Sequence, residues 1–426
     1  MNCMRKISVL LSGFLFCAAP CGAEVVKLKN YELGQWKLDF GLEDWVRVEQ
    51  KQDFDYNNDV SGNGSLVFQR FILNGRATLN EKYEVFASGV DSRVYSAHIK
   101  RTEQEDAFDL RQAYVRANKI AGSRFDLKVG RQVLKYGKAR LISGSTWANR
   151  ESHFDAAVLS YKAEGLYADL LYGSRVRYFD HSFNEWNRHD MLSGAYVGYQ
   201  KDKSAPLVET YFLTNQNLGS IRTLNRHTVG VRAQATAPGN IVCDLEIPYQ
   251  FGKSAGIEIS AYAVHFDATR SFDTTWKPSV TAAYNMATGD RTPGNRNHTF
   301  VPMFQSTHGP YGIMDFFRWQ NMREAALEAS LTPAKKWTLI PGTNFFWLDS
   351  YRDSWYDASG RRLRTMTVGK ARHYVGQEAS LMAKYDLSPE IKLEAGYAHF
   401  FTGDYVKDTG SHDDADWFYF QTSLKI

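Results

Sequence analysis

Cysteine is scarce in this sequence of 426 residues, and most of it lies near the amino terminus. Three of the four cysteines, Cys3, Cys17 and Cys21, precede residue 24, and only Cys243 follows. A mature chain that begins near residue 24 therefore cannot form a disulfide bond within itself, even in an oxidising compartment.

Long apolar runs, linkers and catalytic motifs are also missing. After residue 23 no run reaches the roughly 18 apolar residues that a membrane-spanning helix needs. No stretch rich in proline or serine divides the chain, so we expect one domain over residues 24–426. The sequence has no phosphate-binding loop, no zinc-ligand spacing and no serine–histidine pair in a catalytic context, so we do not expect an enzyme.

The net charge is small. The chain has 51 basic and 47 acidic residues, a formal charge of +4, and loss of Arg5 and Lys6 with the amino-terminal segment leaves +2. A balance this close to neutral predicts no particular partner, and no nucleic-acid-binding surface is expected. Only local clustering of charge can indicate a ligand.

The first 23 residues have the pattern of a secretory signal peptide. Arg5 and Lys6 form a short basic region, and an apolar run of about a dozen residues follows them. Small residues end the segment, so we expect cleavage before Glu24.

The mature sequence contains many segments in which apolar and polar residues alternate, with turn residues between them. In the first of these, Leu38, Phe40 and Leu42 share one face, whereas Lys37 and Asp39 share the other. We expect strands over residues 36–49, 70–79, 83–90, 110–117, 125–129, 154–161, 166–173, 192–199, 207–213, 227–235, 242–251, 256–266, 280–287, 323–331, 337–348, 377–385, 391–400 and 417–425. Helical patterns are absent.

Two classes of β-protein fit this alternation, a large soluble protein and a transmembrane barrel. Aromatic residues make up 14% of the chain and often end a strand, as in the girdles of membrane barrels. The mean hydropathy of −0.43 suits a barrel because its lumen and loops are polar. No propeller or sandwich period is present. We therefore expect an all-β, transmembrane antiparallel β-barrel of about 16–18 strands, with 18 favoured, in the outer membrane of a Gram-negative bacterium.

The segment from Val129 to Asp155 carries an excess of basic side chains. Residues 124–155 contain seven Lys or Arg against three Asp or Glu, and Gly130, Gly137 and Gly144 interrupt the segment. On charge patterning alone, this segment is either a solvated loop or an arginine-lined constriction inside a barrel.

Three groups of residues resemble motifs of the alginate export family of outer-membrane proteins. The first group comprises Gly130-Arg-Gln132, Arg140-Leu-Ile142, Trp147 and Phe154-Asp155. The second comprises Tyr284-Asn-Met-Ala-Thr-Gly-Asp290, Phe300-Val-Pro-Met-Phe304, His308, Tyr311-Gly312, Asp315 and Asn321. The third comprises Gly376-Gln-Glu378 and Gly396-Tyr-Ala-His-Phe-Phe-Thr-Gly-Asp404.

The resemblance implies an 18-stranded monomeric barrel that acts as a passive channel for the polyuronate alginate, with an arginine-rich constriction. It implies that the constriction contains Arg131, Arg140 and Arg150. It also implies acidic counterweights or loop anchors at Asp155, Asp290, Asp315, Glu378 and Asp404. Ser380 stands where the family carries a further acid, so one expected charge is missing.

Arginine suits such a channel because its planar guanidinium pairs with carboxylates in a bidentate manner and stays charged. Passage also requires several weak sites, since a single tight site would trap the solute. Further basic residues on the polar faces of expected strands extend the candidate path: Arg70, Arg76, Arg116, Lys128 and Arg232. The alternative for each is an ion pair that only maintains the shape of the barrel.

Two connections deserve separate interpretations. The connection from Gly289 to Gln320 is long for a structureless loop, so a plug or gate inside the lumen competes with an exposed surface loop. A later turn contains Asp413, Asp414 and Asp416, which could bind Ca²⁺, although a charged hairpin without a metal is simpler. No other cofactor is expected.

We therefore predict an outer-membrane channel that passes an anionic polysaccharide or its fragments. Its expected partners are outer-membrane lipid, the anionic oligo- or polysaccharide and a periplasmic secretion or uptake protein. The first alternative is a general or sugar-acid uptake porin. The second is a structural barrel or a barrel enzyme without transport.

Overall fold

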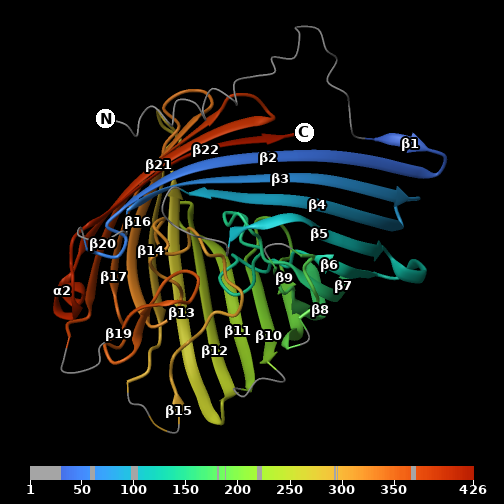
Figure 1. Ribbon diagram of the computed structural model, residues 1–426. Coiled ribbons are helices and arrows are strands. Elements are labelled where there is room, and N and C mark those ends of the chain that lie inside the picture. Colours follow the sequence, from blue (N-terminus) through green and yellow to red (C-terminus); the bar gives the residue numbers. More distant parts are fainter. Residues whose placement is uncertain are drawn as a thin grey trace.

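The computed structural model describes residues 30–57, 63–96, 104–179, 182–187, 189–217, 223–291, 294, 296–365 and 371–426. The expected signal peptide, residues 1–23, lies outside these ranges. Eighteen antiparallel strands form a closed barrel, in which the first strand, β2, pairs with the last, β22 (Figure 1). The predicted barrel and the favoured strand number are confirmed.

The barrel strands follow one another around the ring in chain order. They are β2 (Trp36–Gln52), β3 (Gly64–Leu79), β4 (Tyr83–Ser96), β5 (Asp106–Ala117), β6 (Phe125–Gln132), β7 (Phe154–Lys162), β8 (Leu166–Arg175), β9 (Asp190–Tyr199), β10 (Leu207–Asn217), β11 (Leu224–Ala237), β12 (Ile241–Ser254), β13 (Ile257–Ser271), β14 (Ser279–Ala287), β16 (Met322–Ser330), β17 (Trp337–Trp347), β20 (Tyr374–Asp386), β21 (Ile391–Thr402) and β22 (Ala415–Lys425).

Short elements lie outside the ring. β1 (Tyr31–Leu33) pairs with β2, β15 (Arg296–Asn297) pairs in parallel with β13, and β18 (Ser354–Tyr356) forms a hairpin with β19 (Arg362–Thr365). The helical elements η2 (Ile120–Gly122) and α2 (Asp404–Thr409) contradict the expectation that helices are absent, because such short turns leave no periodic pattern. Within the described ranges, no helix is long and apolar enough to cross a membrane.

Successive side chains along each strand point alternately to the outer and the inner face of the barrel, so this alternation determines which side chains contact lipid. On the outer face Leu73 and Val85 are 51% and 45% exposed, whereas on the inner face Arg70 and Ser88 are 8% and 1% exposed. Apolar side chains outside and polar side chains inside are the arrangement of a transmembrane barrel, because its outer wall contacts hydrocarbon.

The connections differ in length at the two ends of the barrel. At one end the strands are joined by turns such as residues 80–82, 238–240 and 387–390. At the other end, residues 133–153 and 288–321 form long connections. In bacterial outer-membrane barrels the short turns face the periplasm, so the long connections mark the extracellular end.

An apolar core lies inside the extracellular half of the barrel, beneath the long connections. Trp319, Trp355 and Phe400 are completely buried there, and Phe317 stacks on Phe346 with 3.9 Å between ring centroids. The alternation had suggested a wet lumen throughout. The structure differs because the aromatic side chains of the connections fold inward and fill this half.

Candidate functional site

Two long connections cross the interior of the barrel. We call residues 133–153 the first crossing loop and residues 298–321, which follow β15, the second crossing loop. The first contacts opposite walls: Arg47 of β2 donates from Nη1 to the Trp147 carbonyl at 3.0 Å, and Arg140 donates to Glu246 of β12 at 2.8 Å. The segment that the sequence marked as basic therefore spans the lumen.

The second crossing loop is held by the wall through Glu378 of β20. The buried Glu378 carboxylate accepts hydrogen bonds from the backbone N–H groups of Ile313 at 2.5 Å and Met314 at 3.2 Å. The two crossing loops meet in a β-bridge between Ile142 and Phe304. Of the two interpretations of this connection, the structure supports a segment inside the lumen, with Glu378 as an anchor.

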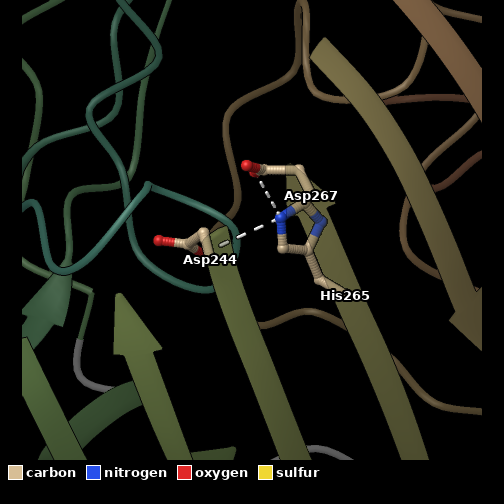
Figure 2. A group of neighbouring side chains, drawn as sticks. All are labelled: Asp244, His265 and Asp267. Atoms are coloured by element: carbon tan, nitrogen blue, oxygen red, sulfur yellow. Dashed lines mark hydrogen bonds and ion pairs between the residues drawn. The ribbon is translucent and has the colours of Figure 1, made fainter. Parts of the chain in front are cut away.

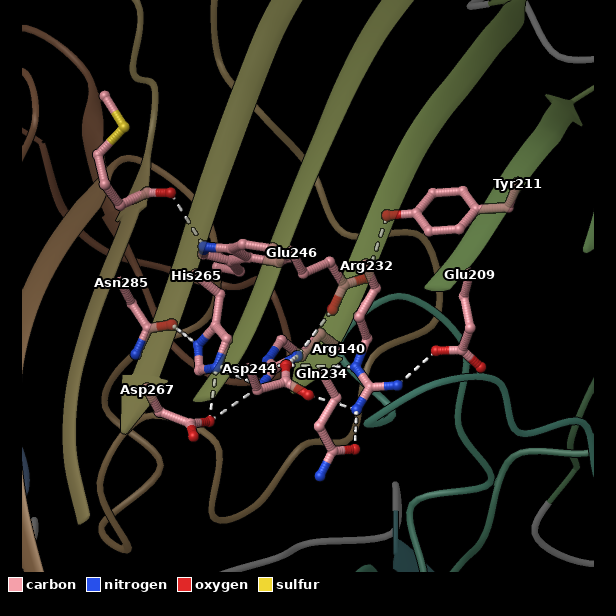
Figure 3. A network of polar contacts seen from close by, with 12 residues as sticks. Arg140, Glu209, Tyr211, Arg232, Gln234, Asp244, Glu246, His265, Asp267 and Asn285 are labelled. Atoms are coloured by element: carbon pink, nitrogen blue, oxygen red, sulfur yellow. Dashed lines mark hydrogen bonds and ion pairs between the residues drawn. The ribbon is translucent and has the colours of Figure 1, made fainter. Parts of the chain in front are cut away.

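Arg140 fixes the first crossing loop to β12 and β13 (Figure 3). Its Nη1 donates to Asp244 Oδ1 at 3.1 Å and to Glu246 Oε2 at 2.8 Å, and its Nη2 lies 3.6 Å from Asp267 Oδ2. The side chain of Arg140 is only 8% exposed. Three acidic partners therefore surround a buried guanidinium, which leaves it little capacity to bind a passing anion.

Arg232 of β11 belongs to the same network. It pairs with Glu209 and Asp244, and Tyr211 donates from its hydroxyl to Glu246 at 3.0 Å. The network as a whole contains two arginines and four carboxylates, a formal charge of −2 with histidine neutral. Arg140 joins the loop to the wall, and Arg232 joins neighbouring strands of the wall. Both therefore fit the alternative that the sequence left open, an ion pair that maintains the shape of the barrel.

Asp244, His265 and Asp267 have the side-chain types of a metal site (Figure 2). Their ligand atoms lie within 4.8 Å of one another, and His265 Nε2 lies 2.8 Å from Asp267 Oδ2. The guanidinium of Arg140 faces the same three residues. The positive charge that the carboxylates require is thus supplied by the chain itself, and we assign no metal to them.

The opposite end of the first crossing loop is fixed by arginines of β3 and β5. Arg70 donates to the carbonyls of Ala148 at 2.7 Å and Thr146 at 3.1 Å. Glu151 lies 3.5 Å from Arg70 Nη1 and accepts a 2.7 Å hydrogen bond from Arg111 Nε. Arg70 was predicted to line the solute path, but the structure shows it holding the loop.

The environment of Glu151 favours its charged form. Burial raises the pKa of Glu151, but His153, whose Nε2 lies 3.5 Å from Glu151 Oε2, and the charges of Arg70 and Arg111 outweigh burial and lower this pKa to about 2. Burial also lowers the pKa of His153. This end of the first crossing loop is therefore held by an ionised carboxylate at neutral pH.

A basic patch lines the lumen near the periplasmic end of β3, β5 and β6. Arg116, Lys128 and Lys135 line a cavity of about 210 Å³, together with the carboxylates of Asp126 and Asp169. Arg116 Nη2 lies 2.9 Å from Asp126 Oδ2, yet the Arg116 side chain remains 32% exposed. Unlike the Arg140 network, this cavity has more basic than acidic side chains.

Arg76 extends the basic patch. Its side chain is 47% exposed and its Nε lies 3.7 Å from Glu84 Oε2. Lys128 Nζ lies 3.8 Å from the ring centroid of Tyr114. It is close enough to Arg76 for the two positive charges to repel each other. We define the basic patch as Arg76, Arg116, Lys128 and Lys135. It can contact a carboxylate in the lumen because its cations are partly solvent-accessible.

Arg131 lies outside the lumen. Along β6 it shares a face with Leu127 and Val129, which are 36% and 41% exposed on the outer wall. Arg131 forms a bidentate pair with Asp155 of β7 at 2.9 and 3.1 Å. The expectation that Arg131 lines the constriction is therefore not met, whereas Asp155 is its acidic partner. The same alternation in the sequence could have revealed this.

The other expected residues lie in the extracellular connections. Arg150, in the first crossing loop, stacks 4.8 Å from the ring centroid of Tyr178. Asp315, in the second crossing loop, lies 2.9 Å from His308 Nδ1. Burial raises the pKa of Asp315, although His308 opposes this effect. Arg150 thus joins the first crossing loop to the connection after β8, and Asp315 joins two parts of the second crossing loop.

Two further acidic residues connect surface segments. Asp290 donates its backbone N–H to Asp353 Oδ2 at 2.9 Å. Asp404 begins α2 and lies 2.9 Å from Arg372 Nη1. These contacts are consistent with loop anchoring.

The aspartates of the last extracellular turn make separate contacts. Asp414 accepts the backbone N–H of Thr402 at 2.7 Å, and Asp416 lies 2.9 Å from His399 Nδ1. Asp413 precedes them and donates its N–H to the carbonyl of Tyr56 at 3.1 Å. In the described part of the chain, the side chains gathered closely enough to share a cation are those beside Arg140 and not these.

Several residues that position the crossing loops were not singled out from sequence. They are Arg47, Arg111, Glu151, Asp244, Glu246 and His265. Asp244 and Glu246 fall on the polar face of the expected strand over residues 242–251, so alternation contained a signal for them. Their partner Arg140 is more than 100 residues away, and no local pattern predicts that pairing.

The closed ring, the apolar outer wall and the polar interior define an outer-membrane channel of the porin class. The chain belongs to the alginate export family, whose model matches residues 36–420. No curated protein matches the sequence significantly. Membership of this family places the protein in the outer membrane of a Gram-negative bacterium, as predicted.

Solved structures with a similar fold are also outer-membrane proteins. OpdK from Pseudomonas aeruginosa has a TM-score of 0.63 at 11% identity, covering 91% of this chain and 99% of its own. Pseudomonas aeruginosa OccK2 (OpdF), solved in complex with glucuronate, has a TM-score of 0.62 at 12% identity, covering 91% and 98%. Acinetobacter baumannii OccAB1 has a TM-score of 0.60 at 12% identity, covering 91% and 96%. At these identities the likeness shows the fold alone.

Proposed function

We propose that this monomeric barrel passes uronate-bearing saccharides, an alginate-like polyuronate or its fragments, passively across the outer membrane. The observation that carries this proposal is the basic patch, formed by Arg76, Arg116 and Lys128 of the lumen wall and Lys135 of the first crossing loop. It is partly accessible and lines a cavity with a local excess of positive charge.

The chemistry of the basic patch suits repeated, weak contacts with carboxylates. Arg116 and Arg76 each have an acidic neighbour, which limits the positive field, while both side chains remain partly exposed. A solute carboxylate can therefore exchange between several cations without being trapped. The Arg140 network has the opposite balance and is assigned to loop positioning.

The dimensions of the lumen support a second candidate, a sugar-acid uptake porin. The crossing loops leave cavities of about 210 Å³ beside the basic patch and about 400 Å³ beside Arg140. The larger cavity falls within the range of roughly 300–1,000 Å³ that holds a small molecule, so its size favours a monosaccharide acid over a polymer. The glucuronate complex of the similarly folded OccK2 agrees with this candidate.

The test is single-channel recording of the refolded protein in a planar bilayer. Reversal potentials in a KCl gradient should show anion selectivity, and oligouronate should block the current reversibly. The combined variant Arg116→Gln, Lys128→Gln and Lys135→Gln should lose most of both effects. Cation selectivity of the native channel, or indifference to uronates, would contradict the proposal.

A matched control and a size series separate the candidates. Lys201→Gln with Lys203→Gln removes exposed charges from a periplasmic turn and should leave selectivity and block unchanged. Block by oligouronate that strengthens with chain length supports the polyuronate channel. Flux of glucuronate without binding of longer oligomers supports the sugar-acid porin.

A further inference from the structure

A second basic cluster lies on the outer wall of the barrel, near the extracellular end. A depression of about 740 Å³ is lined there by Arg291, Arg323 and Arg352, with His373, Tyr284 and Trp347 among the remaining residues. These residues belong to β14, β16, β17 and the connections that follow them. We call this depression the rim pocket.

Strand alternation places the rim pocket on the lipid-facing side. Arg323 pairs across the ladder with Met286 and Trp347, and it shares its face of β16 with Leu327, which is 52% exposed. Tyr284, two residues before Met286 on β14, is 44% exposed. The inner-face neighbour of Arg323, Glu324, is fully buried. The arginine therefore points away from the lumen, within the aromatic girdle that marks the membrane interface.

The charge of the rim pocket is positive. Its lining contains three arginines and one carboxylate, Asp349, which gives a formal charge of +2 with histidine neutral. Arg323 donates to Asp349 Oδ1 from Nε at 3.1 Å and from Nη2 at 2.7 Å, and Arg291 Nη2 lies 3.5 Å from Asp349 Oδ2. Arg352 donates to the Arg291 backbone carbonyl at 3.2 Å, which joins the connection after β17 to the connection after β14.

The buried carboxylate orients the arginines without covering them. The side chains of Arg323 and Arg291 remain 44% and 67% exposed, whereas that of Asp349 is 0% exposed. Arginines held in this way present donors to an anion, and their planar forks match the geometry of phosphate. Trp347 and Tyr284 provide apolar contact on the membrane side of those donors.

We propose that the rim pocket binds the phosphorylated glycolipid of the outer leaflet, with phosphate on Arg291, Arg323 and Arg352 and acyl chains along the adjacent outer wall. This assignment follows from the position of the cations at the membrane interface, because a soluble anion would gain nothing from the apolar side of the pocket. It is independent of the solute that passes through the lumen.

The experiment measures lipid binding by the full-length barrel in detergent, using native mass spectrometry. The probes are a bisphosphorylated hexa-acyl diglucosamine lipid, its dephosphorylated analogue and inorganic phosphate. We expect the phosphorylated lipid to bind about tenfold more tightly than its analogue, since charge-assisted hydrogen bonds carry the difference. The combined variant Arg291→Gln, Arg323→Gln and Arg352→Gln should lose this preference.

A matched control replaces three other exposed arginines near the extracellular end, Arg93, Arg296 and Arg361, by glutamine. Each of these has its own carboxylate partner, and the preference for the phosphorylated lipid should remain. A second variant, Arg291→Gln with Arg352→Gln, keeps the Arg323–Asp349 pair, and an unchanged channel conductance shows that its barrel is intact. Equal binding of the two lipids, an equal loss in the control, or complete displacement by inorganic phosphate would overturn the proposal.

Discussion

The guanidinium of Arg47 lies 3.7 Å from the ring centroid of Trp147, and its Nη1 donates to the backbone carbonyl of the same residue at 3.0 Å. One side chain of the barrel wall thus holds both the ring and the backbone of the first crossing loop. Glu49 in turn accepts a 2.7 Å hydrogen bond from Arg47 Nε. The position of a loop inside the lumen depends on this buried contact.

Replacing Arg47 by alanine should release the first crossing loop. The substitution removes the donor of the Trp147 carbonyl and one of the two cations beside buried Glu49, which keeps Lys51 at 3.1 Å. Loss of this buried charge-assisted contact costs about 2–3 kcal/mol, less than a fully unpaired buried charge would. We expect a lower unfolding temperature together with a larger and noisier single-channel conductance. Arg93→Ala removes an exposed arginine from the outer wall and should change neither quantity. An unchanged conductance in Arg47→Ala would show that this contact does not position the loop.

Replacing Arg140 by glutamine should change ion selectivity in the direction of cations. The substitution alters the formal charge of the Arg140 network from −2 to −3, because Arg232 and the four carboxylates remain. The reversal potential in a KCl gradient should move accordingly, whereas Arg140→Lys should stay near the native value. A shift toward anions would contradict the assignment of Arg140 to a network with excess negative charge.

Two glycines of the second crossing loop provide a matched pair of substitutions. Gly312 and Gly309 both have positive φ, at 73° and 88°, so alanine strains either backbone. At Gly312 a Cβ would lie 2.5 Å from Glu378 Oε2, whereas at Gly309 nothing lies within 4 Å. Gly312→Ala should therefore disturb the Glu378 anchor and expose residues 298–321 to limited proteolysis, as should Glu378→Ala. Equal cleavage of Gly309→Ala would assign the effect to backbone strain alone.

The anchor at Glu151 should depend on pH in the acid range. The pKa of Glu151 is about 2 in the folded protein, below its ordinary value of 4.5. A depressed pKa means that the ionised carboxylate stabilises the fold above about pH 4.5. This contribution is lost as the pH falls from 4.5 toward 2.

The measurement is tryptophan fluorescence of Trp147 between pH 7 and pH 2, compared with Trp147→Phe to isolate its signal. We expect a change below pH 4.5 and none between pH 7 and pH 5 from this group. In Glu151→Gln the acid-dependent step should disappear, since Arg70 and Arg111 then face a neutral amide. If the acid-dependent fluorescence change persists in Glu151→Gln, another group, such as Asp315, causes it.

The sequence was sufficient to determine the barrel. Alternation over segments such as residues 36–49 and 242–251 directs apolar side chains to lipid and polar side chains to the lumen, and this period is local. Continued to residue 131, the alternation of residues 125–129 puts Arg131 on the face of Leu127 and Val129, which is the outer face in the structure. The family resemblance implied that Arg131 lies in the constriction, and the structure contradicts that expectation but agrees with the local alternation.

The tertiary structure decided which charges are accessible. Arg140 and Arg116 were both predicted from sequence to lie on the solute path, yet their side chains are 8% and 32% exposed. The difference arises because Arg140 meets Asp244 and Glu246 across the lumen, more than 100 residues away, whereas Arg116 pairs with nearby Asp126. Asp244 and Glu246 can neutralise Arg140 only when the first crossing loop folds into the lumen. That inward fold depends on contacts between residues far apart in the sequence, which no local pattern contains.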